Sequence, residues 1–158
     1  MSRVLYPGSF DPIHNGHVQV VEQAAELFGS VVVAAMVNPA KVDGAFTLDE
    51  RMAMLRESLA HVPDVEVVQR SGLVVDVATE LGVDFIVKGL RTAGDFEFEM
   101  QMAQTNEAVT GVRTVFVPTA PSFSFLSSRF IREIAREGGD VTHLVPEPVS
   151  RRLKDAHQ

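Results

Sequence analysis

The order of the predicted secondary-structure elements is the feature that most restricts the fold of this chain. Short apolar, β-branched runs alternate with longer segments whose apolar residues recur at helical spacing. Strands are predicted at residues 4–6, 31–37, 65–68, 85–87 and 114–117. Helices are predicted at residues 15–28, 47–60, 74–81, 96–109, 127–137 and 148–156. Strands that alternate with helices indicate crossover connections and a parallel sheet.

Local signals support several of these elements. The first helix places Val18, Val21, Ala25 and Phe28 on one face and ends at Gly29. The run at residues 31–37 is nearly all apolar, which is typical of a strand covered on both faces. A capping box at residues 47–50 opens the second helix. We therefore expect residues 1–158 to form a single doubly wound, Rossmann-like α/β domain with a five-stranded parallel sheet, and ligands to bind beyond the carboxyl ends of its strands.

The composition excludes several classes of protein. The chain has no cysteine, which removes disulfides, thiolate catalysis and cysteine-based metal sites and suits a reducing compartment. The N-terminal segment at residues 2–8 is too short for a signal peptide and is broken by Pro7 and Gly8. The apolar run at residues 31–37 is much shorter than the roughly 20 residues that are needed to span a bilayer. A net charge of −7 disfavours nucleic acid as a partner. We expect a soluble, cytoplasmic protein that binds neither nucleic acid nor membrane.

The segment Tyr6–His17, between the first predicted strand and helix, is rich in groups that bind ligands. Gly8 lets the backbone approach a ligand closely, and Ser9 offers a hydroxyl. His14 and His17 are three residues apart at a helix start and so share a face. Free N–H groups at such a helix start favour a phosphate. The same residues also fit a tight turn with two surface histidines, whereas a zinc site lacks a third ligand.

Further candidate residues follow other predicted strands. Lys41 lies after the second strand, where a phosphate would bind, although a lone loop lysine is often a solvated charge. Lys88 and Arg91 follow the fourth strand and can form a clamp with Lys41, or else are surface charges at a strand end. Ser127 and Ser128 open a late helix, where hydroxyls and free N–H groups suit phosphates or simply cap the helix.

The H-x-G-H motif at residues 14–17, with the preceding GSFDP, resembles the nucleotidyltransferase superfamily. Over nearly its whole length the chain also resembles the bacterial phosphopantetheine adenylyltransferases of coenzyme A synthesis. The segments that carry this resemblance are residues 7–12 (PGSFDP), 38–41 (NPAK), 46–51 (FTLDER), 88–91 (KGLR), 95–101 (DFEFEMQ), 124–128 (SFLSS) and 138–141 (GGDV).

The resemblance implies transfer of AMP from ATP to 4′-phosphopantetheine, which gives dephospho-coenzyme A and pyrophosphate. It implies that His17 contacts the α-phosphate and stabilises the transition state, with Lys41 and Ser9 as further catalytic residues. The implied acceptor contacts are Ser9, Lys41, Val74 and Lys88. The implied ATP contacts are Ser9, Phe10, His17, Gly89, Leu90, Arg91, Glu99, Phe123, Ser124, Phe125, Leu126, Ser127, Ser128 and Arg129.

The resemblance also implies a cofactor and partners. Mg²⁺ would bridge the phosphates of ATP and be carried mostly by the nucleotide and water, so no side-chain ligand is predicted. Relatives assemble as homohexamers, and coenzyme A is expected to act as a feedback ligand because it shares the pantetheine arm and adenine with the substrates. Two positions depart from the family pattern. Relatives often have arginine at position 88, and Lys88 keeps the positive charge but cannot bind a phosphate through two parallel N–H groups. Relatives often have serine or threonine at position 129, where this chain has Arg129.

The motifs contain cations, hydroxyls and helix starts but no clear nucleophile–base pair. Because the acceptor phosphate is already ionised near neutral pH, positioning and charge stabilisation would suffice. The alternatives are an enzyme for another acceptor, such as nicotinamide mononucleotide, or glycerol 3-phosphate with CTP, and a non-catalytic nucleotide or coenzyme A sensor. An aminoacyl-tRNA synthetase core shares the H-x-G-H motif, but this chain is too short and too acidic for tRNA.

Overall fold

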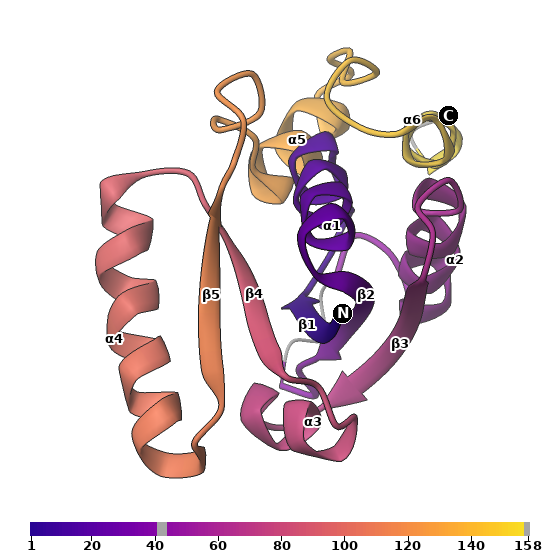
Figure 1. Ribbon diagram of the computed structural model, residues 1–158. Helices are drawn as coiled ribbons and strands as arrows, with labels where there is room; N and C mark the ends of the chain where they lie inside the picture. The colour runs from indigo at the N-terminus through magenta and orange to yellow at the C-terminus, as the bar shows by residue number, and fades with distance from the viewer. Residues whose placement is uncertain (41–43, 157–158) are drawn as a thin grey trace.

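The computed structural model describes residues 1–40 and 44–156, and Figure 1 shows strands alternating with helices along them. The strands are β1 (Ser2–Gly8), β2 (Gly29–Val37), β3 (Val65–Ser71), β4 (Phe85–Leu90) and β5 (Arg113–Pro118). The helices are α1 (Asn15–Phe28), α2 (Leu48–Ser58), α3 (Val74–Glu80), α4 (Ala93–Thr110), α5 (Ser128–Arg136) and α6 (Glu147–Ala156). All eleven predicted elements are confirmed.

The strands form one parallel, five-stranded sheet in the order β3-β2-β1-β4-β5. The predicted Rossmann-like α/β fold is therefore confirmed. The chain winds from β1 out to β3, crosses back to β4 and ends at β5, so the direction of winding reverses between β1 and β4. In sheets of this kind a ligand binds beyond the carboxyl ends of the strands at that reversal.

The centre of the sheet, at β1 and β2, is buried on both faces. Residues of β2 alternate between two cores, with Val31, Val33 and Ala35 in one and Val32 and Ala34 in the other. Helices α1, α2, α5 and α6 cover the first core, and α3 covers the second. This arrangement explains why β2 has no polar face, as its sequence predicted.

The predicted apolar face of α1 is confirmed in part. Val21 is buried, and Val18, Ala25 and Phe28 are partly buried against the same core, but the other buried residues of the helix are Gly16, Val20 and Ala24. Val20 packs closely against β4. A Cβ added to Gly89 of that strand would lie 2.8 Å from a methyl of Val20, so glycine leaves the room for this contact.

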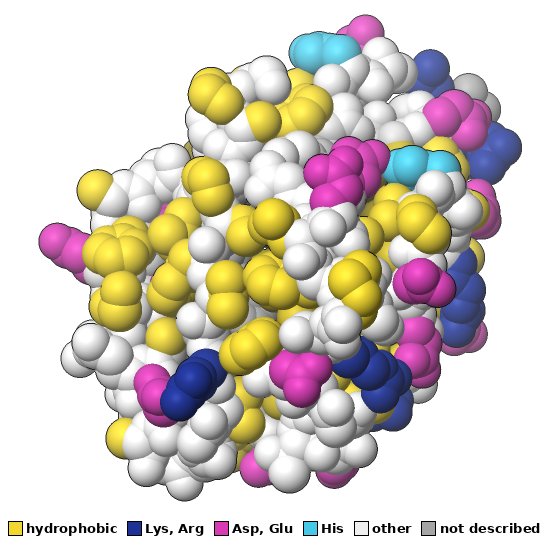
Figure 2. Space-filling view, in the orientation of Figure 1, with side chains coloured by type: hydrophobic (Ala, Val, Ile, Leu, Met, Phe, Trp, Pro, Cys, Tyr) yellow, Lys and Arg dark blue, Asp and Glu magenta, His cyan; other side chains and the backbone are white. Residues whose placement is uncertain are grey.

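Helix α4 lies along the outer edge of the sheet, beside β5 (Figure 1), and none of its residues is buried. Its exposed apolar side chains include Phe96, Phe98, Met102 and Val109. In Figure 2 hydrophobic side chains gather over the part of the molecule where Figure 1 draws α4 and β5. None of the described helices is long and apolar enough to cross a membrane.

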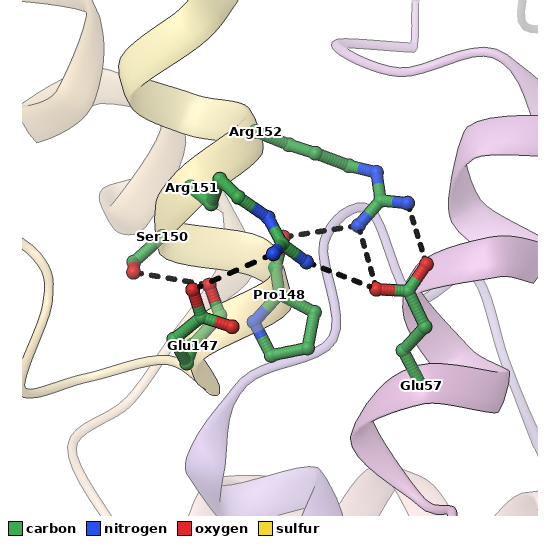
Figure 3. A network of polar contacts seen from close by, with 6 residues as sticks. All are labelled: Glu57, Glu147, Pro148, Ser150, Arg151 and Arg152. Carbon is green, nitrogen blue, oxygen red and sulfur yellow. Dashed lines mark hydrogen bonds and ion pairs between the residues drawn. The ribbon is translucent and has the colours of Figure 1, made fainter.

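Helix α6 is held against α2 by an ion-pair network (Figure 3). Glu57 of α2 accepts bonds of 2.6 and 3.2 Å from the guanidinium of Arg152 and one of 3.3 Å from Arg151. The bond from Arg152 is the largest cause that lowers the pKa of Glu57. On the same side of the sheet, the segment before α6 reaches α1, where the carbonyl of Leu144 accepts a hydrogen bond of 3.0 Å from the N–H of Asn15.

Candidate active site

A cavity of about 1240 Å³ lies at the carboxyl ends of the strands. It is lined by the loop after β1, the ends of β2 and β4, and residues of all the helices from α1 to α5. Since it spans the reversal between β1 and β4, it lies where doubly wound sheets bind ligands. Its size exceeds that of a pocket for one small metabolite, since such pockets range from about 300 to 1,000 Å³.

Two stacked histidines cap the start of α1. The Nδ1 atom of His14 accepts hydrogen bonds from the backbone N–H groups of Gly16 (3.0 Å) and His17 (3.3 Å). The Nδ1 atom of His17 accepts one in return from the N–H of His14 (3.1 Å). The two rings stack with their centres 3.6 Å apart. Packing and backbone bonds therefore fix both imidazoles, and both residues line the cavity.

The hydrogen bonds assign the protonation of both rings. Since each Nδ1 is an acceptor, each neutral imidazole carries its proton on Nε2. Burial lowers the pKa of His14 to about 4, and the positive charge of Arg91 acts in the same direction. Burial, then His14 and Arg91, also place the pKa of His17 well below its ordinary value. At neutral pH the motif presents uncharged N–H donors rather than positive charges.

The start of α1 is not a free anion site, contrary to the sequence prediction. Its first N–H groups already have acceptors: Asn15 donates to Leu144, and Gly16 and His17 donate to His14. A phosphate bound here must therefore use the Nε2–H groups of the histidines. Gly16 leaves room for the capping ring of His14, because a Cβ at position 16 would lie 2.9 Å from Cε1 of that ring.

The start of α5 differs from that of α1. The N-cap residue Ser127 makes no capping bond with its side chain, so simple capping does not explain this serine. The hydroxyl of Ser128 instead donates to the carbonyl of Pro12 at 2.8 Å. Within residues 1–40 and 44–156, the N–H groups of residues 128–130 have no hydrogen-bond acceptor. They are available to an anion at the edge of the cavity.

The cavity is rich in cations although the chain has a net charge of −7. Its described lining includes one lysine and four arginines, against two carboxylates. Three of these cations contact a carboxylate: Lys88 lies 3.7 Å from Glu99, Arg91 3.2 Å from Asp95 and Arg129 3.2 Å from Glu133. The local gathering of cations that an anionic substrate requires is thus present.

The remaining two arginines anchor the loop after β1. Arg51 of α2 donates from Nη1 to the carbonyl of Ser9 at 2.8 Å. Arg132 of α5 donates from Nη1 to the carbonyl of Asp11 at 2.6 Å. Between these bonds Phe10 has a φ of 48°, a left-handed conformation that is uncommon for a bulky side chain. The two arginines thus help to hold a backbone shape that the loop would not favour alone.

Asp11 connects this loop to the segment before α2. Its two carboxylate oxygens accept hydrogen bonds from the N–H groups of Ala45 (3.1 Å) and Phe46 (3.2 Å). The sequence analysis did not select Asp11, Arg51 or Arg132 as site residues. The sequence signals for them are positional: Asp11 and Arg51 lie in the segments 7–12 and 46–51 that carry the family resemblance, and Arg132 lies four residues after Ser128 on the same face of the late helix.

The structure brings most of the predicted site residues to one cavity. Those that line it are Ser9, His17, Val74, Lys88, Gly89, Arg91, Glu99, Ser127, Ser128 and Arg129. Those that do not line it are Phe10, Leu90, Phe123, Ser124, Phe125 and Leu126. Lys41 lies outside the described residues.

The aromatic and apolar residues that do not line the cavity have other surroundings. Phe10 is buried and packs edge-on behind His17, with ring centres 5.0 Å apart. Leu126 is buried as well, and its carbonyl accepts a bond of 2.5 Å from Arg91. The side chain of Phe125 is exposed.

The described residues contain no cluster of three or more His, Asp, Glu or Cys side chains that could hold a metal ion. The two carboxylates in the cavity wall already have partners. Asp11 accepts two backbone bonds, and Glu99 lies beside Lys88. This donor set fits a metal ion that arrives on a phosphate ligand better than one held in a cage of protein oxygens.

A protein-family model matches most of the chain. The model of a family described as cytidylyltransferase-like matches residues 5–134. The matched range begins in β1 and ends within α5, so it contains both the H-x-G-H motif and the start of α5. All the residues that line the cavity therefore lie within the matched range.

Proposed function

The chain belongs to the cytidylyltransferase-like family and is a nucleotidyltransferase, and from this premise we propose that it transfers AMP from ATP to 4′-phosphopantetheine. The products would be dephospho-coenzyme A and pyrophosphate. The choice of ATP and of this acceptor rests on the sequence resemblance of residues 7–12, 88–91 and 95–101. The family match supports the nucleotidyl transfer itself.

One observation supports the proposal most strongly. A cavity at the reversal of the sheet combines a fixed imidazole N–H donor, an uncapped helix start and several cations. Such groups stabilise negative charge on phosphates without taking part in proton transfer. They are the groups that a phosphate-to-phosphate transfer requires, because both reactants are anions and the nucleophile is already ionised.

In the proposed reaction an oxygen of the acceptor phosphate attacks the α-phosphorus of ATP in line with the bond to the β-phosphate. The new P–O bond forms as the bond to pyrophosphate breaks, and no proton needs to move. The Nε2–H group of His17 would donate to an oxygen of the α-phosphate as charge develops there. Because Nδ1 is fixed by the N–H of His14, this donor is oriented before substrate binds.

The remaining residues would hold the two ends of the reactants. Lys88, with Lys41, would bind the acceptor phosphate, and Glu99 beside Lys88 would help to orient its amine. Ser9, Arg91 and the start of α5 would hold the nucleotide phosphates. Mg²⁺, carried on the phosphates of ATP, would supply further charge neutralisation.

We also propose a homohexamer in the cytoplasm. The apolar side chains on α4, which include Phe96, Phe98 and Met102, support self-association because a surface helix of a monomer usually presents a polar face. Coenzyme A is proposed as a feedback ligand of the same cavity, because it carries both the pantetheine arm and the adenine of the substrates.

A pyrophosphate-release assay with mass-spectrometric identification of the product tests the function. ATP, Mg²⁺ and 4′-phosphopantetheine should give pyrophosphate and dephospho-coenzyme A in equal amounts. Parallel reactions contain nicotinamide mononucleotide, or glycerol 3-phosphate with CTP. Turnover with only one of these would replace the proposed acceptor and retain the chemistry. Nucleotide binding without turnover in any reaction would favour the sensor instead.

A further inference from the structure

Tyr6 is a buried titratable side chain in the cavity wall that the proposed reaction does not use. It lies near the carboxyl end of β1, the central strand of the sheet, and lines the cavity although only 7% of its surface is exposed. Its ring packs edge-on against Phe10, with ring centres 5.5 Å apart, and lies tilted beside His17, with ring centres 6.4 Å apart. These contacts hold the side chain of Tyr6 in one position.

The hydroxyl of Tyr6 has no hydrogen-bond partner within residues 1–40 and 44–156. Among those residues, the polar side-chain atoms that are both sealed from solvent and unpartnered are Nε of Arg51 and Oγ of Ser58. The Tyr6 hydroxyl is therefore in contact with the space of the cavity. A buried hydroxyl usually has a partner, because leaving it unbonded costs free energy. An unpartnered donor in the wall of a binding cavity points to a ligand atom as its partner.

The Tyr6 hydroxyl carries a proton that it does not readily lose. Burial raises the pKa of Tyr6 well above its ordinary value, and the positive charge of Arg91 offsets this only in part. At neutral pH the phenol is therefore an uncharged donor, like the imidazole of His17 beside it, and it does not act as a general base. Such a donor suits an anionic oxygen, because a hydrogen bond to a charged acceptor is stronger than one between neutral groups.

The neighbours of Tyr6 indicate which anion it would bind. The ring of Tyr6 lies beside that of His17, whose free N–H group is on Nε2. Besides burial, the positive charge of Arg91 acts on the pKa of both Tyr6 and His17, so the three side chains lie near one part of the cavity. In the proposed reaction His17 donates to the α-phosphate of the nucleotide. The same phosphate is therefore the anion nearest to the Tyr6 hydroxyl.

We propose that the hydroxyl of Tyr6 donates a hydrogen bond to an oxygen of the nucleotide's α-phosphate, beside the Nε2–H group of His17. This inference rests on the proposed nucleotidyl transfer but not on the identity of the acceptor. Tyr6 is then a substrate-binding residue whose donor is held in place before the nucleotide arrives. The purely structural alternative is that Tyr6 serves only to pack against Phe10 and His17.

Calorimetric titration of Tyr6→Phe with AMP, adenosine and inorganic pyrophosphate separates the two, because this variant keeps the ring and loses only the hydroxyl. We expect the affinity for AMP to fall by about 10- to 100-fold, as for the loss of a hydrogen bond to a charged group. Adenosine and pyrophosphate lack the α-phosphate, so their affinities should change less than about twofold. The free energy of unfolding in urea should not fall, because the fold loses no hydrogen bond.

The chain contains a single tyrosine, which offers a second measurement on the unaltered protein. In protein labelled with ¹³C at Cζ of tyrosine, the one NMR signal should move when AMP binds and keep its position when adenosine or pyrophosphate binds. This measurement carries the test if Tyr6→Phe does not fold. Val33→Ala is the matched control, because Val33 is buried beside Tyr6 on β2 and does not line the cavity. It disturbs the packing but keeps the hydroxyl, so the AMP affinity should be unchanged.

Several results would overturn the proposal. Unchanged AMP affinity in Tyr6→Phe would do so, as would an NMR signal that does not respond to AMP. Equal losses of AMP affinity in Tyr6→Phe and Val33→Ala would assign Tyr6 to packing alone. A selective loss of 4′-phosphopantetheine binding in Tyr6→Phe would place the hydroxyl on the acceptor instead. A failure of the acceptor assay alone would leave the proposal standing, whereas an unaltered protein that does not bind AMP would overturn both this contact and the proposed transfer.

Discussion

The stacked histidine pair should make the stability of the fold fall steeply in mild acid. His14 has a pKa of about 4 in the folded protein, against about 6.5 in an unfolded chain. Between these values the unfolded chain binds a proton that the folded protein does not, so the free energy of unfolding decreases as the pH falls. For His14 alone, the loss relative to neutral pH is about 2 kcal/mol at pH 5 and about 3 kcal/mol at pH 4.

The variant His14→Asn isolates this effect. Asparagine caps helices through a side-chain oxygen but carries no proton in this range, so α1 should keep its cap. Urea denaturation followed by circular dichroism, at pH 7, 6, 5 and 4, gives the free energy of unfolding of both proteins. Low protein concentrations are needed because the range crosses the pI of about 5.2. Carboxylates titrate in both proteins, so the difference between the two curves reports His14. If the free energies of unfolding of the two proteins fall in parallel from pH 7 to pH 4, the conclusion that His14 caps α1 as a neutral imidazole is wrong.

Three further outcomes follow from the geometry of the site. His17→Ala should lower kcat by on the order of 10²–10³-fold, as for loss of an oriented donor to a developing anion, with at most a few-fold change in ATP affinity; an unchanged kcat contradicts its role. Gly16→Ala should lower the free energy of unfolding by about 1 kcal/mol, because its Cβ would displace the capping ring of His14, although alanine is the better helix former; a more stable variant in urea would show that the ring can move. Asp11→Asn should lower stability by about 1–3 kcal/mol and speed hydrogen exchange in residues 44–46, because an amide oxygen replaces only one of the two acceptors; unaltered exchange would exclude that tether.

The fold could be read from the sequence because its signals are local. Apolar runs, helical spacing, the capping box at residues 47–50 and the glycine at position 29 each depend on a few neighbouring residues, and the structure contains each of these features. The buried face of α1 was predictable only in part. Val21 is buried as the apolar pattern predicts, whereas the burial of Val20 also depends on a residue of another element, because Gly89 of β4 leaves room for its side chain.

The site was predicted only in part for a similar reason. The motifs identified the loops that meet at the cavity, because the carboxyl ends of parallel strands share one edge of a sheet. They did not show that two histidines cap α1, since histidine is not among the usual capping residues. Nor did they give a role to Arg51 and Arg132, which come from two helices far apart in the sequence and contact the same loop only in the folded protein.

The most direct test of the central proposal follows the α-phosphorus of ATP. The protein is incubated with Mg²⁺, 4′-phosphopantetheine and ATP that carries a radioactive label on either the α- or the γ-phosphate. The proposed reaction places the α-label in dephospho-coenzyme A and the γ-label in pyrophosphate, in equal amounts. An α-label that remains in ATP, or that appears in free AMP or ADP instead of the pantetheine product, would contradict the proposal.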